Sequence, residues 1–256
     1  MGEGHAVRLL RLTLEYDGGG FHGWARQPGQ RTVEGVLREA LDIIYPRGWD
    51  DLAVAGRTDT GVHATGQVAS VKVTAGAPAS KAAEALNTAL PPDVSILAAV
   101  DAPGGFHARF SATGRSYRYI VLNRPARSAL DVRRSLWWPQ ALDLDRLQAC
   151  AALLLGEHEF TAFTPADSQH EVFVRIVRAA RWERHGDHLH FTVSADSFLR
   201  HMVRTLVGTM LQSSPERFAH LVEGRPRLEG GATAPPWGLY LEHVEYAVAG
   251  VDTIEG

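Results

Sequence analysis

The residues best suited to chemistry lie in one short polar run, AGRTDTGVHA, at positions 55–64. A guanidinium (Arg57), a carboxylate (Asp59) and an imidazole (His63) fall close together there, directly after the apolar stretch DLAV. A carboxylate at a strand end can attack a substrate or move a proton, and a nearby arginine can hold an anion. A tight turn capped by Asp59 would explain the aspartate, but it would require neither Arg57 nor His63. The run is therefore the leading candidate site.

Two glycine-containing patterns could indicate an aspartic protease or a phosphate-binding loop. The Asp-Thr-Gly triplet at 59–61 also occurs in aspartic proteases, but those enzymes need a second carboxylate, and this chain has no second copy of the triplet. The GGG run at 18–20 lacks the lysine and the spacing of a phosphate-binding loop. We expect a hairpin turn there instead, because glycine supplies the positive φ that tight turns need.

The histidine pattern does not favour a metal site. The closest group among the 12 histidines is His185, His188 and His190, which flanks a Gly-Asp turn and lacks a second ligand pair. That arrangement favours a solvated hairpin over zinc binding. The GEHEF stretch lacks the second histidine of an HExxH motif, and no GxSxG nucleophile elbow occurs. The sequence predicts no metal.

The composition is that of an ordinary globular protein. The chain has 256 residues, of which 45% are hydrophobic and 21% charged, enough for one large domain or two of average size. Its single cysteine, Cys150, excludes an intramolecular disulfide, and a reducing, cytoplasmic setting fits. No secretion signal is recognisable, and no apolar run approaches the roughly 20 residues of a membrane span, so we expect no membrane association.

Charge is unevenly distributed along the chain. The net charge is −3, yet residues 106–134 carry seven arginines and one acid, Asp131. Arginine forks bind phosphates and bases, so this segment would suit a nucleic acid. A solvated charged stretch gives the same pattern, and the charge alone leaves both interpretations open.

Hydrophobic periodicity predicts the elements that position the polar run. Strands are expected at 8–16, 51–56, 67–73, 94–100, 116–123 and 238–246, with a hairpin at 173–194 that turns at 185–187. Helices are expected at 32–45, 80–90, 144–155 and 197–211, the second with Ser80 as its N-cap. The order β-α-β-β-α-β therefore occurs twice. It predicts an α+β fold of two ferredoxin-like halves with joined antiparallel sheets, comprising residues 1–104 and 105–256.

GRTDTGVHA resembles the active-site loop of the TruA family of tRNA pseudouridine synthases. The likeness covers nearly the whole chain in order: YDGGGFHGW precedes the loop, and LPPDV, FHARFSA, RSYRYI, EHEFTAF, SFLRHMVRTLVG and GLYL follow it. A nine-residue loop of mixed polar residues, accompanied by seven further blocks in the same order, is a specific signal. The departures are mild: Ala25 stands where the family often has glutamine, and the overall charge is acidic.

The resemblance implies the pseudouridine synthase fold and a defined reaction. Members of the family convert uridine to pseudouridine at positions 38, 39 and 40 in the anticodon stem-loop of tRNA. The N1–C1′ bond breaks, the base turns, and C5 bonds to C1′. The family uses neither cofactor nor metal, and its members work as homodimers whose tRNA contacts both subunits. The arginines of 106–134 would then contact phosphates, and binding would depend strongly on salt.

The resemblance also assigns roles to four residues. Asp59 is the essential carboxylate, acting either as a nucleophile on the base or C1′ or through proton transfer at the sugar. Arg204 pairs with Asp59, because a carboxylate in a pocket that excludes water needs a fixed cation to stay ionised. Tyr117 stacks on the uracil and its hydroxyl assists removal of the C5 proton. Arg57 holds the flipped nucleotide or fills the gap that it leaves.

The sequence pattern by itself also permits purely structural interpretations of these residues. Arg204 lies at the border of an apolar helical stripe, where an arginine can simply extend to water. Tyr117 and Tyr119 alternate on one strand face, which suits two core aromatics. Two other functions also compete: a non-catalytic RNA-binding protein, for which Asp59→Ala would bind RNA unchanged, and a hydrolase with Asp59 as nucleophile, which would release free base.

Overall fold

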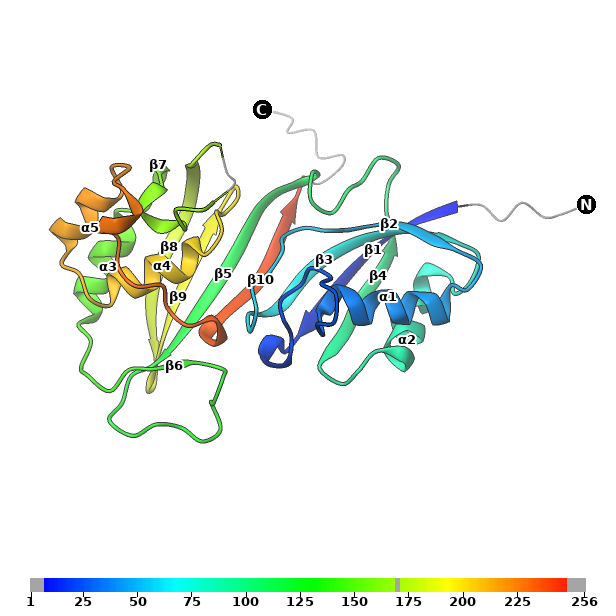
Figure 1. The fold of residues 1–256 in the computed structure, drawn as a ribbon, viewed down its shortest axis with the longest axis horizontal. Coiled ribbons are helices and arrows are strands. Elements are labelled where there is room, and N and C mark those ends of the chain that lie inside the picture. The colour runs from blue at the N-terminus through cyan, green and yellow to red at the C-terminus, as the bar shows by residue number, and fades with distance from the viewer. Residues whose placement is uncertain (1–6, 169–170, 248–256) are drawn as a thin grey trace, which may run out of the picture.

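The protein, described here from a computed structural model, forms one ten-stranded sheet flanked by helices (Figure 1). The structure describes residues 7–168 and 171–247. Helices α1 and α2 lie beside the N-terminal strands, and α3, α4 and α5 gather beside the C-terminal strands at the other end of the sheet. Within the described residues, no helix combines the length and the apolar character needed to cross a membrane.

The N-terminal half contains four strands and two helices in the predicted order. They are β1 (Val7–Tyr16), α1 (Val33–Ile44), β2 (Trp49–Val54), β3 (His63–Thr74), α2 (Ala79–Ala89) and β4 (Val94–Asp101), with a 3-10 turn, η1 (Gly18–Gly20), after β1. The strands lie in the order β4-β1-β3, and β2 pairs with the far end of β3. This antiparallel arrangement is that of a ferredoxin-like unit.

The local sequence explains why these elements form. Thr32 caps α1 by accepting a hydrogen bond from the backbone of Gly35, and the helix buries Leu37 and Leu41 on one face. In β1, every second residue from Leu10 to Leu14 is fully buried, as expected for a strand with one face in the core.

The C-terminal half repeats this order with insertions. Its strands are β5 (Ala112–Leu122), β6 (Leu136–Trp137), β7 (Gly156–Glu159), β8 (Val174–His185), β9 (His188–Ala195) and β10 (Leu239–Tyr246). Its helices are α3 (Leu144–Ala152), α4 (Met202–Met210) and α5 (Pro215–Leu221), with 3-10 turns η2 (Thr161–Phe163), η3 (Arg227–Glu229) and η4 (Pro236–Gly238). The strand order β10-β5-β9-β8-β7 places the second ferredoxin-like unit directly beside the first.

The two halves join through a short parallel contact between β3 and β10. Tyr240 is paired with His63, and Leu241 with Ala64. The predicted α+β fold of two joined ferredoxin-like halves is confirmed. Pairing inside each half is antiparallel apart from the short parallel pair of β5 and β6, and the seam between the halves is parallel. The predicted boundary at residues 104 and 105 falls between β4 and β5 and remains a prediction.

Three local predictions were wrong. The helix expected at 197–211 begins only at Met202, because His201 adopts a left-handed conformation (φ 61°) that an α-helix cannot contain. Ser80 does not cap α2, whose N-cap is Pro78 without a side-chain hydrogen bond. The GGG run forms the 3-10 turn η1 between β1 and α1, not a hairpin turn.

Candidate active site

The polar run forms the connection between β2 and β3 and enters β3 at the seam. Backbone hydrogen bonds hold it against the block at 16–24: Trp24 donates to the carbonyl of Thr58 (3.0 Å), and Gly61 donates to that of Phe21 (3.3 Å). Because both contacts are to backbone atoms, they fix the path of the chain on either side of Asp59 independently of side-chain motion.

Two glycines of that block permit this close approach. A Cβ at Gly18 would overlap the carbonyl oxygen of Val62, and one at Gly23 would lie 2.8 Å from the carbonyl oxygen of Thr58. Gly23 also has φ +80°, which side-chain-bearing residues rarely adopt. The first glycine-rich block therefore serves as the surface on which the loop containing Asp59 is built.

Asp59 lies opposite Arg204, which comes from α4 in the other half of the chain. Arg204 Nη1 donates to Asp59 Oδ2 at 3.0 Å, and its Nε donates to the carbonyl of Ala234 at 2.8 Å. The Arg204 side chain is only 14% exposed and that of Asp59 is 31% exposed. Held at two points, the guanidinium is a fixed cation beside a partly shielded carboxylate.

His201 is a further neighbour of Asp59 that sequence reasoning missed. Its Nε2 lies 3.5 Å from Asp59 Oδ2, and its left-handed backbone immediately precedes α4. Burial lowers the pKa of His201 below its usual value, although the Asp59 carboxylate opposes that shift. Both neighbours lie against Oδ2, and no residue in the described part of the chain forms a hydrogen bond or ion pair with Oδ1. Asp59 Oδ1 is thus available to a substrate.

Tyr117 lies on β5 at the base of the same site and is almost fully buried. Its ring packs edge-on against Phe198, with centroids 5.0 Å apart. Burial raises the pKa of Tyr117 well above its usual value, and the nearby Tyr16 and Asp59 act in the same direction. Among the described residues, none hydrogen-bonds to its hydroxyl. The phenol is therefore neutral and unpaired beside Asp59.

Arg57 completes the set of residues singled out in the sequence. Its side chain is exposed, and it has no ion pair or hydrogen bond with any residue in 7–168 or 171–247. A cavity of about 1350 Å³ is lined by Arg57, Asp59, Tyr117 and Arg204, among other residues. The structure thus brings together all four predicted site residues, two from each half of the chain.

The cavity has a predominantly cationic lining. Six arginines line it (Arg57, Arg109, Arg115, Arg175, Arg200 and Arg204), whereas Asp59 and Glu34 are its only carboxylates within the described residues. This balance suits a polyanionic substrate.

The structure separates the arginines of 106–134 into two groups. Arg118, Arg124 and Arg134 form ion pairs with Glu242, Asp187 and Asp17, and Arg115 donates to four backbone carbonyls. Arg109, Arg127 and Arg133 have no acidic partner in the described part of the chain. The guanidinium groups of the second group are therefore the ones most accessible to a phosphate.

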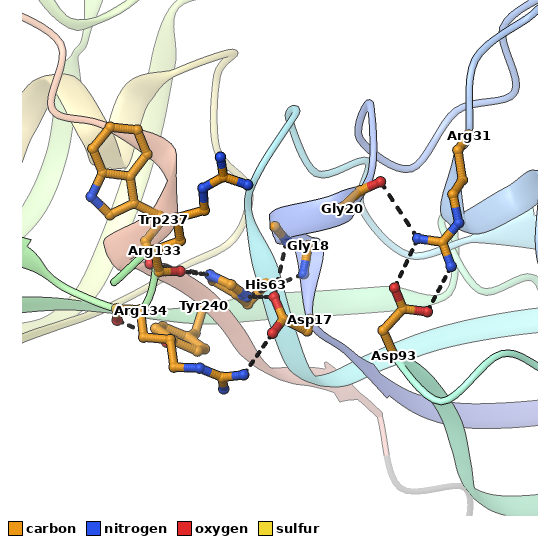
Figure 2. Close-up of polar contacts among 11 residues, drawn as sticks. Asp17, Gly18, Gly20, Arg31, His63, Asp93, Arg133, Arg134, Trp237 and Tyr240 are labelled. Atoms are coloured by element: carbon orange, nitrogen blue, oxygen red, sulfur yellow. Dashed lines mark hydrogen bonds and ion pairs between the residues drawn. The ribbon is translucent and has the colours of Figure 1, made fainter. Parts of the chain in front are cut away.

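His63, the last titratable residue of the run, does not line the cavity but lies at the seam between β3 and β10. Figure 2 shows it beside Asp17 and Gly18. It is 2% exposed, its Nδ1 accepts a hydrogen bond from Gly18, and its Nε2 lies 2.9 Å and 3.1 Å from the carbonyls of Arg133 and Trp237. Burial lowers its pKa, although the Asp17 carboxylate, whose Oδ1 lies 3.1 Å from Nδ1, and the two carbonyls oppose that shift. His63 links segments of both halves next to the loop of Asp59.

The three histidines of the β8–β9 hairpin are close but unsuited to a metal. The rings of His185 and His190 lie 4.4 Å apart, and burial and neighbouring cations lower the pKa of His190 to about 4. In the described ranges, no group of three or more histidine, cysteine, aspartate or glutamate side chains is arranged to hold a metal ion.

Comparisons with known proteins extend over most of the chain. A family model described as tRNA pseudouridine synthase matches residues 13–111 and 150–247. A protein named tRNA pseudouridine synthase A from Caldicellulosiruptor bescii is 37% identical over 245 residues, covering 94% of this chain and 100% of that protein. One of the same name from Paramagnetospirillum magneticum is 41% identical over 246 residues, covering 94% and 96%.

A solved structure also matches at the level of the chain trace. It is the crystal structure of a Cbf5-Nop10-Gar1 complex, with 12% sequence identity and a TM-score of 0.39. The match covers 90% of this chain and 57% of the chain in that structure.

Proposed function

This chain belongs to the tRNA pseudouridine synthase family, and from that premise we propose that it isomerises uridine to pseudouridine at positions 38, 39 and 40 of the anticodon stem-loop of tRNA. The observation that carries the proposal is the meeting of Asp59 with Arg204 beside Tyr117, in a cavity whose lining is rich in arginine. A carboxylate held by one oxygen and open at the other is what either proposed chemistry of the family requires.

The reaction balances without any outside reagent. The N1–C1′ bond of uridine breaks, the base turns, a C5–C1′ bond forms, C5 loses its proton and N1 gains one. In the proposed mechanism Asp59 Oδ1 adds to C1′ or to the base, or takes a proton from the sugar. Both versions use the Asp59 carboxylate, whose Oδ2 accepts a hydrogen bond from Arg204 Nη1 at 3.0 Å.

The remaining residues have distinct proposed tasks. Tyr117 stacks on the uracil, and its neutral hydroxyl assists removal of the C5 proton; its position beside Asp59 with no hydrogen-bond partner in the described residues supports this role. Arg57 holds the target nucleotide out of the stack, a step that any enzyme acting on a base in a stem requires. Its exposure on the cavity wall and its lack of an ion pair within the described residues suit a phosphate or base.

The proposal extends to assembly and location. We expect a homodimer in the cytoplasm, with each tRNA in contact with both subunits and with residues 1–104 and 105–256 acting as the two halves of each subunit. The logarithm of the tRNA affinity should fall linearly with the logarithm of the salt concentration, with a slope set by the number of phosphates that the protein neutralises.

The test is tritium release from tRNA that carries [5-³H]uridine, with wild-type protein and Asp59→Asn in parallel. Transcripts that retain uridine at only one of positions 38, 39 and 40 separate the three sites. We expect release by the wild type at each position and none by Asp59→Asn, which should still bind tRNA. Folded, tRNA-binding wild-type protein that releases no tritium would overturn the proposal in favour of a binding protein. Free uracil among the products would indicate a hydrolase.

A further inference from the structure

The rim of the cavity carries an exposed aromatic residue whose exposure the roles above leave unexplained. Phe110 keeps 76% of its surface accessible, although it lines the same cavity as Asp59. An apolar ring of this size at the mouth of a cationic site is costly to hydrate, and exposed aromatics in such places commonly contact a ligand.

The turn that presents Phe110 is held rigidly. His107 Nδ1 accepts hydrogen bonds from the backbone of Arg109 (3.1 Å) and Phe110 (3.3 Å), and the His107 ring lies against Phe110 with centroids 4.4 Å apart. At the turn's base, Ala108 donates to Ser70 Oγ and accepts from the Tyr246 hydroxyl. A ring on a turn fixed at so many points loses little conformational entropy when it binds.

A single guanidinium connects this turn to the catalytic loop. Arg115 Nη2 donates to the carbonyl of Arg109 and to that of Ala55, both at 3.0 Å. Ala55 opens the polar run that contains Asp59. Because one nitrogen donates to both carbonyls, this guanidinium couples the turn that carries Phe110 to the loop that carries Asp59.

The charges around Phe110 identify the kind of partner. Arg109 lies over its ring, with Cζ 5.6 Å from the centroid, and Arg57 lines the same cavity without an acidic partner in the described part of the chain. An apolar protein surface has no negative charge to pair with these cations. A nucleotide offers a π-face to the ring and a phosphate to the guanidinium groups.

We infer that Phe110 is a stacking platform for an unpaired base of the substrate RNA next to the target uridine, with Arg109 and Arg57 binding the adjoining phosphates. The inference rests on the proposed function, since it takes the uridine at Asp59 as its reference point. It gives the site a second base-binding position, which holds the RNA strand while the target nucleotide is out of the stack.

The test uses photo-crosslinking, because stacked 5-iodouridine reacts with aromatic side chains. Transcripts carry 5-iodouridine at single unpaired positions flanking the target, and the crosslinked residue is mapped by mass spectrometry. We expect one flanking position to crosslink to Phe110. Phe110→Ala should lose that crosslink and weaken tRNA affinity by about 5- to 100-fold, the usual range for one base–aromatic stack. Phe110→Trp should keep the affinity within about 3-fold.

Leu228→Ala is the matched control, because Leu228 is 97% exposed on η3 and does not line the cavity. It should leave the affinity unchanged. Phe110→Ala protein that binds tRNA like the wild type, or crosslinks that map to other residues, would overturn the inference. Loss of dimer at unchanged RNA affinity would overturn it too, by assigning Phe110 to a protein interface. Affinity and crosslinking need no turnover, so they decide this question even if tritium release shows that the proposed function is wrong.

Discussion

Two aspartate–arginine pairs in this molecule are built differently. Arg31 binds Asp93 through both nitrogens and both oxygens, each contact at 2.8 Å, and both residues belong to the N-terminal half (Figure 2). Arg204 binds Asp59 through one nitrogen and one oxygen at 3.0 Å, and the pair bridges the two halves. By geometry alone, the pair of Arg31 and Asp93 is the better ion pair.

The difference separates a pair suited to a structural role from the pair proposed to take part in the reaction. The Asp93 carboxylate has both oxygens engaged, and the Arg31 hydrogen bond lowers its pKa, so it has little left to offer a substrate. Asp59 Oδ1 has no hydrogen bond or ion pair within the described residues, while Oδ2 accepts from Arg204 and lies 3.5 Å from His201 Nε2. Incomplete pairing of a carboxylate that lines a cavity is the feature we expect of the proposed reactive group.

The largest expected effect comes from Asp59→Asn. The amide keeps the shape but can neither attack nor take a proton, so single-turnover tritium release should fall by about 10³-fold or more. The free energy of unfolding should change by less than about 1 kcal/mol, because the pair is partly exposed. Activity within tenfold of the wild type would remove Asp59 from the reaction. Asp93→Asn is the control, with turnover unchanged.

Arg204→Gln should have the next largest effect. Removing the cation leaves the carboxylate without its fixed partner, so we expect turnover to fall by about 10²-fold. The substitution also breaks the hydrogen bond to Ala234, so the free energy of unfolding should drop by about 1–2 kcal/mol in urea titrations. Arg31→Gln is matched in chemistry and should lower stability alone. Equal turnover in the two variants would contradict the distinction between the pairs.

Tyr117→Phe and Tyr119→Phe extend the comparison to two tyrosines on one strand. The Tyr119 hydroxyl donates to the carbonyl of Pro235 at 2.8 Å, whereas no described residue bonds that of Tyr117. Tyr119→Phe should therefore cost about 1 kcal/mol of unfolding free energy with turnover kept. Tyr117→Phe should keep stability and lose about tenfold or more in turnover. The opposite assignment in thermal melts and tritium assays would place the functional hydroxyl on Tyr119.

The smallest effect concerns the pH dependence of the pair of Asp93 and Arg31. The pKa of Asp93 is lowered in the folded state, so the pair stabilises the fold above the ordinary aspartate value near 4. That contribution is lost as the pH falls through the lowered value. Discounted for exposure, it is below about 1 kcal/mol. Urea titrations of wild type and Asp93→Asn should differ by a constant amount above about pH 5, and the difference should shrink as the pH falls from the ordinary aspartate value towards the lowered one. A difference that does not change with pH over this range would contradict the assignment.

Much of the fold was predictable because the signals are local. Alternation in β1 and the i, i+3, i+4 spacing of α1 depend on residues a few positions apart, and both elements form close to where they were expected. The start of α4 was not predictable in this way. The apolar pattern continues through Phe198 and Leu199, yet His201 turns left-handed where it meets Asp59, a residue far away in the sequence.

The sequence by itself determined the kinds of groups available: a carboxylate with an arginine in a glycine-flanked loop, and the order of elements around it. Only the tertiary structure decided which groups meet. Asp59 and Arg204 are 145 positions apart, and the parallel contact of β3 with β10 brings their halves together. The tertiary structure also decided which arginines have no acidic partner among the described residues, and that Phe110 is exposed at the cavity. Pairing, burial and exposure depend on all the neighbours in space, whereas periodicity depends only on neighbours in sequence.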